Sequence, residues 1–338
     1  MKPPNPPIVV FGAYGHTGRF VVAELHKRGW TPILSGRDAA KLAVLAKEYS
    51  GSEVRPASVD DPASLDHAIV GAGAVINCAG PFIDTAAPVI EAAIRSGAHY
   101  LDIAAEQPAV LSVFERFAGP AREAGLLIVP AMAFYGGLGD LLATRAMGDW
   151  ASADEILIGT ALDSWNPTRG TRLTGKRNPG QHVTYSDSKL DPTDPLPRMW
   201  TFPAPFGRQE VVGLSLSETI TISRHLHARQ IHAYINHAPI KDISNPETPP
   251  PTAADGSGRS SQVFLMETIA RKGNAERRAV ARGRDIYAIT APLAVEAAGR
   301  VVNGLVLRTS GVVAPGEAFD APDFLSSLAR ADLSFENR

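Results

Sequence analysis

The first 130 residues alternate short, mostly apolar runs with stretches of helical periodicity. The runs predict strands at residues 8–11, 31–34, 53–57, 74–78, 99–102 and 126–130. Between them, apolar residues recur at spacings of three and four, which predicts helices, and Gly29 and Gly97 are placed to end two of them. Strands that alternate with helices in this way require a parallel, doubly wound sheet.

Beyond residue 138 the alternation stops. The pattern predicts a helix over 139–150 and a strand over 155–162. Residues 164–205 are rich in Pro, Gly, Asn, Asp and Thr, which predicts a long loop region. Two later stretches, 218–224 and 229–236, predict short strands or strand–helix transitions.

The remaining residues predict a hairpin and a returning helix. Strands at 262–270 and 276–282 flank Lys272-Gly273-Asn274, a typical hairpin turn. The Pro- and Gly-rich residues 245–258 predict a surface excursion, and 285–302 again has helical periodicity. Antiparallel strands that follow a βα half indicate a second, α+β domain.

We therefore predict an α/β protein with two domains, since 338 residues exceed one typical domain. Residues 1–138 form a dinucleotide-binding Rossmann domain with a doubly wound parallel sheet. Residues 139–284 form an α+β domain with a mixed or antiparallel sheet, which we expect to bind the substrate. That sheet is also the expected interface of a homodimer.

The composition and net charge limit the kinds of partner and the location that we expect for this protein. The net charge of −2 argues against a nucleic-acid surface, which needs a concentrated basic patch. A single cysteine excludes an intramolecular disulfide framework and suits a reducing compartment. Residues 1–7 contain no apolar signal region and no stretch approaches 18 apolar residues, so we expect a cytoplasmic protein without a membrane partner. Four histidines between 225 and 237 lack a fitting carboxylate or cysteine, so we predict no metal site.

The end of the first strand carries the strongest chemical signal. Gly12, Gly15 and Gly18 follow an apolar run and precede a helical pattern. Gly12 allows a tight turn, Gly15 lets the backbone approach a pyrophosphate, and Gly18 lets the helix pack on the strand. The predicted cofactor contacts in this turn are Gly12, Ala13, Tyr14, Gly15, His16, Thr17 and Gly18.

The end of the second strand indicates which dinucleotide binds. An NAD enzyme would place a carboxylate here for the ribose 2′-hydroxyl, whereas this chain has Ser35, Gly36 and Arg37. A hydroxyl and a guanidinium suit a 2′-phosphate, because arginine presents a planar, always-charged fork to phosphate oxygens. NADP is therefore the predicted cofactor. The alternative is that Arg37 is a surface residue beside Asp38, a helix N-cap.

The fourth strand ends in residues that we place beside the nicotinamide. Ligands of open α/β sheets bind outside the carboxyl ends of the strands. The predicted contacts here are Asn77, Cys78, Ala79, Gly80 and Pro81. Cys78 is either a reactive thiol or, on the ordinary reading, a small buried apolar residue.

Proton transfer needs a group near the ends of strands four to six. By position, the candidates are Tyr100, Asp102, Glu106, Tyr135 and Asp140. We select Tyr135, Tyr100 and Asp102 as catalytic residues, with Tyr135 first because a phenol can donate a proton to carbanion-like or imine-like intermediates. Structural alternatives exist, since Tyr100 and Asp102 could fix the turn after the fifth strand.

Four segments together resemble the saccharopine dehydrogenase-like oxidoreductases, especially the branch related to bacterial trans-acting enoyl reductases. The first two are the glycine turn 12–19, similar to Gly-Ala-Thr-Gly-aromatic-Thr-Gly-Arg, and 35–37. The others are the turn 77–82 and residues 100–106, similar to Tyr-x-Asp-x-x-Gly-Glu. The resemblance implies NADP(H), a Rossmann domain completed by residues 285–338, and substrate bound between the two domains.

The chain also departs from the family pattern. Tyr14 replaces a smaller residue, His16 stands where an aromatic residue is usual, and Ala105 replaces the motif glycine. Residues 133–140 loosely match Gly-Phe-Asp-x-x-Pro-x-Asp, with Tyr135 in place of a carboxylate. In the second half, residues 168–171 resemble a substrate-domain turn whose Arg169 either holds a substrate carboxylate or is solvated.

These features predict an NADPH-dependent oxidoreductase that reduces a C=C, C=N or C=O bond of a small metabolite. Two other classes stay open. A non-catalytic NADP-binding sensor or scaffold protein would have the same fold, because a fold alone does not prove turnover. A lyase or transferase with tightly held NAD(P) is the third possibility.

Overall fold

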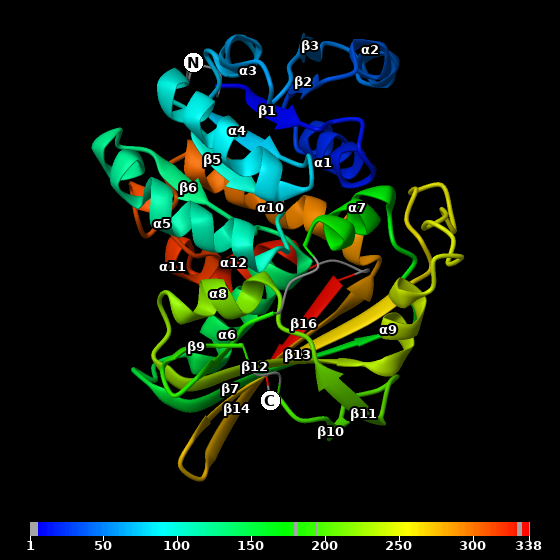
Figure 1. Cartoon of the computed structure of the whole chain (residues 1–338), viewed down its shortest axis with the longest axis vertical. Coiled ribbons are helices and arrows are strands. Elements are labelled where there is room, and N and C mark those ends of the chain that lie inside the picture. The colour runs from blue at the N-terminus through cyan, green and yellow to red at the C-terminus, as the bar shows by residue number, and fades with distance from the viewer. Residues whose placement is uncertain (1–5, 179–181, 193–194, 330–332, 338) are drawn as a thin grey trace.

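A computed structural model describes residues 6–178, 182–192, 195–329 and 333–337. Its first sheet contains seven parallel strands in the order β15-β6-β5-β4-β1-β2-β3 (Figure 1). The order of β1 to β6 is that of a Rossmann sheet, and it reverses between β1 and β4. The predicted doubly wound sheet is confirmed, and the carboxyl ends of its strands define the edge where a ligand binds.

The elements of this half lie where the sequence pattern predicts them. The strands are β1 (Ile8–Phe11), β2 (Ile33–Gly36), β3 (Glu53–Pro56), β4 (Ala74–Asn77), β5 (His99–Asp102) and β6 (Leu127–Val129). The helices are α1 (His16–Lys27), α2 (Ala39–Glu48), α3 (Pro62–Ile69), α4 (Phe82–Ser96) and α5 (Gln107–Glu123). Asp38 and Asp61 cap α2 and α3, since their carboxylates accept from the amides of Lys41 and Ser64.

Helices cover both faces of the first sheet. Apolar residues of α3, α4 and α5 form a core on one face. On the other face, α1 packs against α10 (Ile286–Val302), and residues of α1, α2 and α10 share a core that continues into the second sheet. In Figure 1, α10 lies between the two halves. Because one apolar core joins them, the ends of β4, β5 and β6 are held in a fixed relation to the second half.

The second sheet is mixed, as predicted. Its order is β10-β11-β12-β7-β13-β14-β16, with β8 beside β12 and β9 beside β8, and only β12 and β7 run parallel. The strands are β7 (Ala153–Leu162), β8 (Thr184–Ser186), β9 (Lys189–Asp191), β10 (Arg198–Thr201), β11 (Arg208–Gly213), β12 (Ala228–Asn236), β13 (Val263–Lys272), β14 (Ala275–Arg284) and β16 (Leu333–Asn337). The hairpin β13–β14 turns at Gly273, as predicted.

The other helices of this half lie between the sheets or at the edges of the second. They are the π-helix η1 (Phe134–Leu138), α6 (Gly139–Met147), α7 (Arg169–Arg177), α8 (Ser217–Ser223) and α9 (His237–Ser244). Among the described residues, no helix is long and apolar enough to cross a membrane. Residues 245–258 form neither helix nor strand, and the Arg172 guanidinium donates to the carbonyls of Asn245 and Thr248 in this stretch.

The C-terminal residues are divided between the sheets. The short strand β15 (Gly311–Val312) extends the first sheet beside β6, and α11 (Pro315–Ala318) and α12 (Ala321–Leu328) follow. The last strand, β16, pairs with β14 in the second sheet. Residues 333–337 therefore do not complete the Rossmann sheet, and residues 1–5 of the predicted first domain lie outside the described residues. The predicted division of the chain otherwise stays a prediction.

Two predictions for the second half are wrong. Residues 164–205 are not one long loop, because they contain α7, β8, β9 and β10. The strands escaped the pattern because each has only three or four residues, too few for an alternation to stand out. The helix α7 follows Thr168, whose hydroxyl accepts from the amide of Thr171. Residues 218–224 alternate like a strand, yet most of them form α8, since packing against η1 and α6 overrides the β preference of Thr and Ile.

Candidate functional site

The glycine turn between β1 and α1 has the geometry that a pyrophosphate requires. Gly12 has a positive φ of 83°, and its amide donates to the carbonyl of Ser35. A Cβ on Gly18 would lie 2.3 Å from the Gly12 carbonyl oxygen, so α1 can approach the turn only with glycine there. At Gly15 the nearest atom to such a Cβ, apart from its chain neighbours, is again the Gly12 oxygen, at 3.1 Å, and no atom of another segment lies within 4 Å. The turn therefore leaves open space over the amides at the start of α1.

The end of β2 fits a phosphorylated ribose. Ser35 and Gly36 are buried, and the Tyr14 ring packs on Gly36, where a Cβ would lie 2.9 Å from it. Arg37 is exposed and forms no ion pair with another described residue. The ammonium of Lys41 lies 5.6 Å from the centre of the Tyr14 ring. Arg37, together with Lys41 of α2, whose ammonium also pairs with Asp38 over 3.1 Å, thus places cationic donors where a 2′-phosphate binds.

The turn after β4 is fixed by a buried hydrogen-bond network. The Asn77 amide donates to the hydroxyls of Thr85 and Tyr100, and its oxygen accepts from the amide of Ala79. The Tyr100 hydroxyl donates to Asp102 over 2.9 Å. These bonds hold the peptides of the turn 77–81 in place, as a binding surface for a nicotinamide requires.

Tyr100 and Asp102 are fully occupied within this network. The second Asp102 oxygen accepts from the amides of Ala104 and Ala131, at 3.0 and 2.7 Å. Both side chains are buried, and burial raises the pKa of each. The sequence proposed them as proton-transfer groups. The contacts instead favour its structural alternative, because both Asp102 oxygens and the Tyr100 hydroxyl are already engaged in bonds that fix the turns after β4 and β5.

Glu106, unlike Tyr100 and Asp102, has a buried oxygen without a hydrogen-bond partner among the described residues. One of its oxygens accepts from the amide of Phe82, at 2.8 Å, and from the hydroxyl of Thr174, at 3.2 Å. The other oxygen is buried and has no partner among the described residues. Burial raises the pKa of this carboxyl to about 7. It can therefore gain or lose a proton near neutral pH, directly beside the turn after β4.

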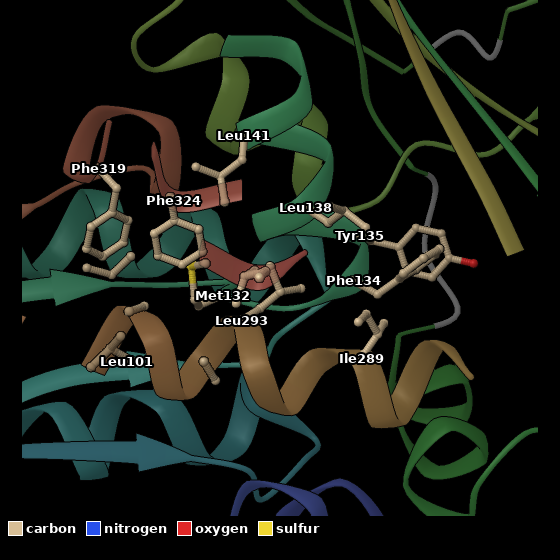
Figure 2. Close-up of a cluster of buried hydrophobic side chains, with 14 of the residues drawn as sticks. Leu101, Met132, Phe134, Tyr135, Leu138, Leu141, Ile289, Leu293, Phe319 and Phe324 are labelled. Carbon is tan, nitrogen blue, oxygen red and sulfur yellow. The ribbon is translucent and has the colours of Figure 1, made fainter. Parts of the chain in front are cut away.

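Tyr135 stands on η1, after the sixth strand. Its ring packs at the edge of the buried apolar cluster, and Figure 2 shows its hydroxyl pointing away from that cluster. The hydroxyl is buried and without a partner among the described residues. Burial, and then the nearby Glu218 carboxyl, raise the pKa of Tyr135 well above its ordinary value. The phenol therefore keeps its proton and acts as a hydrogen-bond donor.

Glu218, in the first turn of α8, is a site residue that sequence reasoning missed. One oxygen accepts from the amide of Leu216 over 2.9 Å, while the other is buried and unpartnered among the described residues. Burial raises its pKa to about 7. The hydroxyls of its neighbours Ser217 and Thr219 are buried and unpartnered as well. The only signal in the sequence was one carboxylate among hydroxyl-bearing residues, and the strand-like alternation concealed it.

A backbone contact joins the two glutamates. The amide of Ser217 donates to the carbonyl of Ala105 over 3.1 Å. Glu218 is the next residue after Ser217 and Glu106 the next after Ala105, so this bond brings the two glutamates' backbones together. The Gln107 side chain adds bonds to the carbonyls of Val183 and Leu216. The loop after β5 and the start of α8 thereby form one continuous polar surface.

A row of aromatic side chains connects the phosphate turn with this surface. The rings of His16 and Tyr287 lie 5.4 Å apart, and the Trp165 indole nitrogen donates to the Tyr287 hydroxyl. Trp165 in turn lies 5.7 Å from the Tyr135 ring. Burial lowers the pKa of His16, so its imidazole is neutral near pH 7. We call these four residues the aromatic row.

The other candidates lie outside this arrangement. Burial raises the pKa of the Cys78 thiol, which favours the small apolar residue over the reactive nucleophile. Asp140 is buried and bonds to His225 over 2.6 Å. Burial alone would lower the pKa of His225, but the Asp140 carboxylate raises it. Among the described residues, no group of three or more His, Cys, Asp or Glu could hold a metal ion.

Residues 8–129 match the model of the saccharopine dehydrogenase NADP binding domain. The match extends from the first residue of β1 to the last of β6, so it covers the glycine turn and all the predicted cofactor contacts. It confirms the resemblance to the saccharopine dehydrogenase-like proteins and NADP as the nucleotide of this domain, while the narrower likeness to the enoyl reductase branch stays a prediction.

Curated relatives match over the same part of the chain. A saccharopine dehydrogenase-like oxidoreductase of Bos taurus is 30% identical over 145 residues, which are 38% of this chain and 34% of that protein. A probable mitochondrial saccharopine dehydrogenase-like oxidoreductase of Arabidopsis thaliana is 32% identical over 142 residues, 38% of this chain and 31% of that one. A lipid droplet localized protein of Caenorhabditis elegans is 31% identical over 136 residues, 37% and 32% of the two chains. The matched stretch spans about a third of these relatives.

A solved structure matches the whole fold. Saccharopine dehydrogenase (L-Glu forming) from Saccharomyces cerevisiae superposes with a TM-score of 0.65 over 98% of this chain and 100% of that one. The sequence identity is 13%, so this likeness concerns the fold. It confirms that the Rossmann sheet and the mixed sheet form one known two-sheet architecture.

Proposed function

Because this chain belongs, through residues 8–129, to the saccharopine dehydrogenase-like family of NADP-binding proteins, we propose that it is an NADPH-dependent oxidoreductase. It reduces a C=C, C=N or C=O bond of a small metabolite. The observation that carries this proposal is Glu106, a buried carboxyl with one free oxygen beside the turn after β4. Bound NADPH supplies a hydride, and such a reduction needs one proton from the protein when the product would otherwise be an anion.

The chain holds the cofactor along the carboxyl edge of the first sheet. The amides at the start of α1 bind the pyrophosphate over Gly15, where the space is open. Arg37 and Lys41 bind the 2′-phosphate. The peptides of 77–81, fixed by Asn77, orient the nicotinamide.

Glu106 donates the proton. Its oxygen bonded to Phe82 and Thr174 fixes the carboxyl, so the free oxygen keeps one direction. With its pKa raised to about 7, the carboxyl is protonated in a useful fraction of molecules at neutral pH, which suits a general acid. Tyr135, whose pKa is far higher, keeps its proton and orients the substrate instead.

The variant Glu106→Gln tests this role. It keeps the bonds to Phe82 and Thr174 through the amide oxygen but has no proton to give. We expect kcat/KM for NADPH-dependent reduction, measured over a panel of enones, imines and keto compounds, to fall about 10²- to 10⁴-fold. NADPH affinity by fluorescence titration should not change. Asp84→Asn, which alters an exposed carboxylate on α4 paired with Arg177, is the matched control.

The pH dependence provides a second readout. A donor must be protonated, so wild-type kcat/KM should fall as the pH rises through about 7, and this limb should be absent in Glu106→Gln. Full activity of the variant would reject Glu106 as the donor. If the panel gives no turnover while NADPH still binds, the sensor or scaffold alternative gains support.

The cofactor preference has its own test. Replacing Arg37 by Glu places a negative charge at the end of β2, so the affinity for NADPH should fall by about 10- to 100-fold relative to NADH. Tighter binding of NADH than NADPH by the wild-type protein would contradict the assignment. The homodimer and the cytoplasmic location stay predictions, and light scattering on the purified protein measures the first of them.

A further inference from the structure

Among the described residues, the charged side chains that are buried as a whole are all acidic, and no Lys or Arg is among them. The buried acids are Glu24, Asp102, Glu106, Asp140, Glu218, Glu267 and Asp285. A further anion brought among them would find no buried cation to pair with.

Five of these acids already have their partners. Glu24 pairs with Arg28, Asp140 with His225 and Glu267 with Arg278. Asp102 and Asp285 accept hydrogen bonds on both oxygens. Only Glu106 and Glu218 combine a free buried oxygen with the absence of a cation among the described residues.

We propose that the reacting end of the substrate is an uncharged carbonyl group on a planar apolar frame, received between Tyr135 and Glu218. Substrates with a carboxylate next to that carbonyl are excluded. This inference rests on the proposed reduction and names the substrate class of the same site. It favours the C=O option, conjugated enones included, over charged amino-acid imines and keto acids.

The free groups of the site suit a carbonyl oxygen. The Tyr135 hydroxyl is a donor, and the Ser217 hydroxyl lies 2.8 Å from the position that a Cβ on the next residue, Gly136, would occupy. A protonated Glu218 carboxyl adds a third donor. Each of these groups is buried without a partner, and a carbonyl oxygen that accepts from them would satisfy groups that are costly to leave unpaired.

The same groups offer a carboxylate no cation. An anionic substrate would be desolvated beside Tyr135, Ser217 and Glu218 without a partner of opposite charge, and whenever Glu218 is ionised the two anions would repel each other. Arg169, which could in principle hold a carboxylate, is exposed at the start of α7 and is not one of the buried groups. His16, the basic residue of the aromatic row, has its pKa lowered by burial and carries no charge near pH 7.

The aromatic row sets the shape of the apolar frame. Trp165 is held by its bond to Tyr287, and its ring lies 5.7 Å from that of Tyr135. Aromatic faces prefer offset-stacked or edge contacts with flat apolar groups. A flat, conjugated body can therefore lie along Trp165 while its carbonyl reaches the Tyr135 hydroxyl.

A matched pair of substrates tests the proposal. Methyl benzoylformate and benzoylformate share a phenyl ring and a ketone, and differ in whether the adjacent carboxyl group is esterified or ionised. We expect the wild-type protein to reduce the ester with a kcat/KM at least about 100-fold above that of the acid. Binding of both compounds to the NADP⁺-loaded protein is measured by calorimetry, so that affinity is known without turnover.

Two variants locate the discrimination. Tyr135→Phe should weaken binding of the ester about 10-fold, since it removes one donor. Glu218→Gln keeps a donor but removes the acidic group, so the ester should bind as before and the preference for ester over acid should shrink several-fold. Glu210→Gln, at an exposed carboxylate of β11, is the control that should change neither value.

Each outcome decides the matter. Equal or better use of the acid overturns the inference, while the proposed reductase function stands. If neither compound is reduced but the ester binds at least 100-fold more tightly than the acid, the site assignment stands and the proposed reduction fails for these ketones. If neither compound binds, or if Glu218→Gln leaves the ester preference unchanged, the inference is wrong.

Discussion

Two neighbouring buried regions of this protein differ in how fully the oxygens of their carboxyl groups are hydrogen-bonded. Around Asp102, every carboxylate oxygen accepts a hydrogen bond, from Tyr100 and from the amides of Ala104 and Ala131. Around Glu106 and Glu218, each carboxyl leaves one buried oxygen without a partner. Because buried polar groups without partners cost free energy, the bonds around Asp102 stabilise the fold. The free oxygens of Glu106 and Glu218 reduce stability until a bound ligand supplies their partners.

The largest effect expected from a single substitution is a loss of stability in the region around Asp102. Asp102→Ala leaves three buried donors without an acceptor, so the free energy of unfolding should fall by about 4 kcal/mol. Urea unfolding followed by circular dichroism measures this loss. Glu106→Ala is the comparison, since it frees only the amide of Phe82 and the hydroxyl of Thr174. An equal loss in both variants would remove the distinction between the two regions.

The second prediction concerns stability against pH. The folded-state pKa of Glu106 and Glu218 is about 7, above the ordinary glutamate value, so the folded protein binds more protons between about pH 4.5 and 7. The stabilisation that comes from their protonation is fully present below that window. It is lost as the pH rises through the window, which lowers the free energy of unfolding by about 3 kcal/mol for each group.

The double variant Glu106→Gln/Glu218→Gln should abolish this loss. Its unfolding free energy, measured by urea at pH 4.5, 6 and 7.5, should fall less with rising pH than that of the wild type. Asp84→Asn serves as the comparison, because it alters an exposed carboxylate, leaves both glutamates in place and should retain their pH dependence. A wild-type profile that is flat over this window would contradict the raised pKa of both carboxyls.

Tyr100→Phe gives a smaller effect and separates structure from catalysis. The variant loses the bonds to Asn77 and Asp102, which should reduce stability by about 1 kcal/mol. Activity per folded molecule, with the folded fraction taken from the unfolding curve, should stay within about threefold. A 100-fold loss of activity in fully folded protein would restore Tyr100 as the proton donor that the sequence suggested.

The smallest effect connects α7 with Glu106. The Thr174 hydroxyl donates to the Glu106 carboxyl and lowers its pKa, against the larger effect of burial. Thr174→Val should therefore move the alkaline limb of the pH–activity profile upward by a few tenths of a pH unit, with little change in maximal activity. Thr201→Val, at an exposed position of β10, should leave the profile in place.

Predictions from the sequence succeed where neighbours along the chain decide the structure. The glycine turn 12–18, the capping by Asp38 and the hairpin at Gly273 each depend on a few consecutive residues. The same holds for the strands of the first sheet, whose apolar runs are local. Failures cluster in the second half, where β8 and β10 are short and α8 has the alternation of a strand.

The candidate site shows the same division. Sequence reasoning found Tyr135 and listed Glu106 among the possible donors, because both follow strands of the Rossmann sheet. Glu218 was missed, since nothing near it in the chain shows that Ser217 bonds to Ala105 and brings α8 to the end of β5. The choice of Tyr100 and Asp102 followed their position, which does not report how many hydrogen bonds they form.

The sequence by itself determined the Rossmann sheet, the dinucleotide turn and the preference for a 2′-phosphate, because backbone freedom and charge at those positions are properties of adjacent residues. Only the tertiary structure decided which buried carboxyls have both oxygens hydrogen-bonded and which keep one oxygen free for a ligand. Whether a buried carboxyl is satisfied depends on donors that other elements bring to it. Asp102 receives them on both oxygens, while Glu106 and Glu218 each keep one oxygen free.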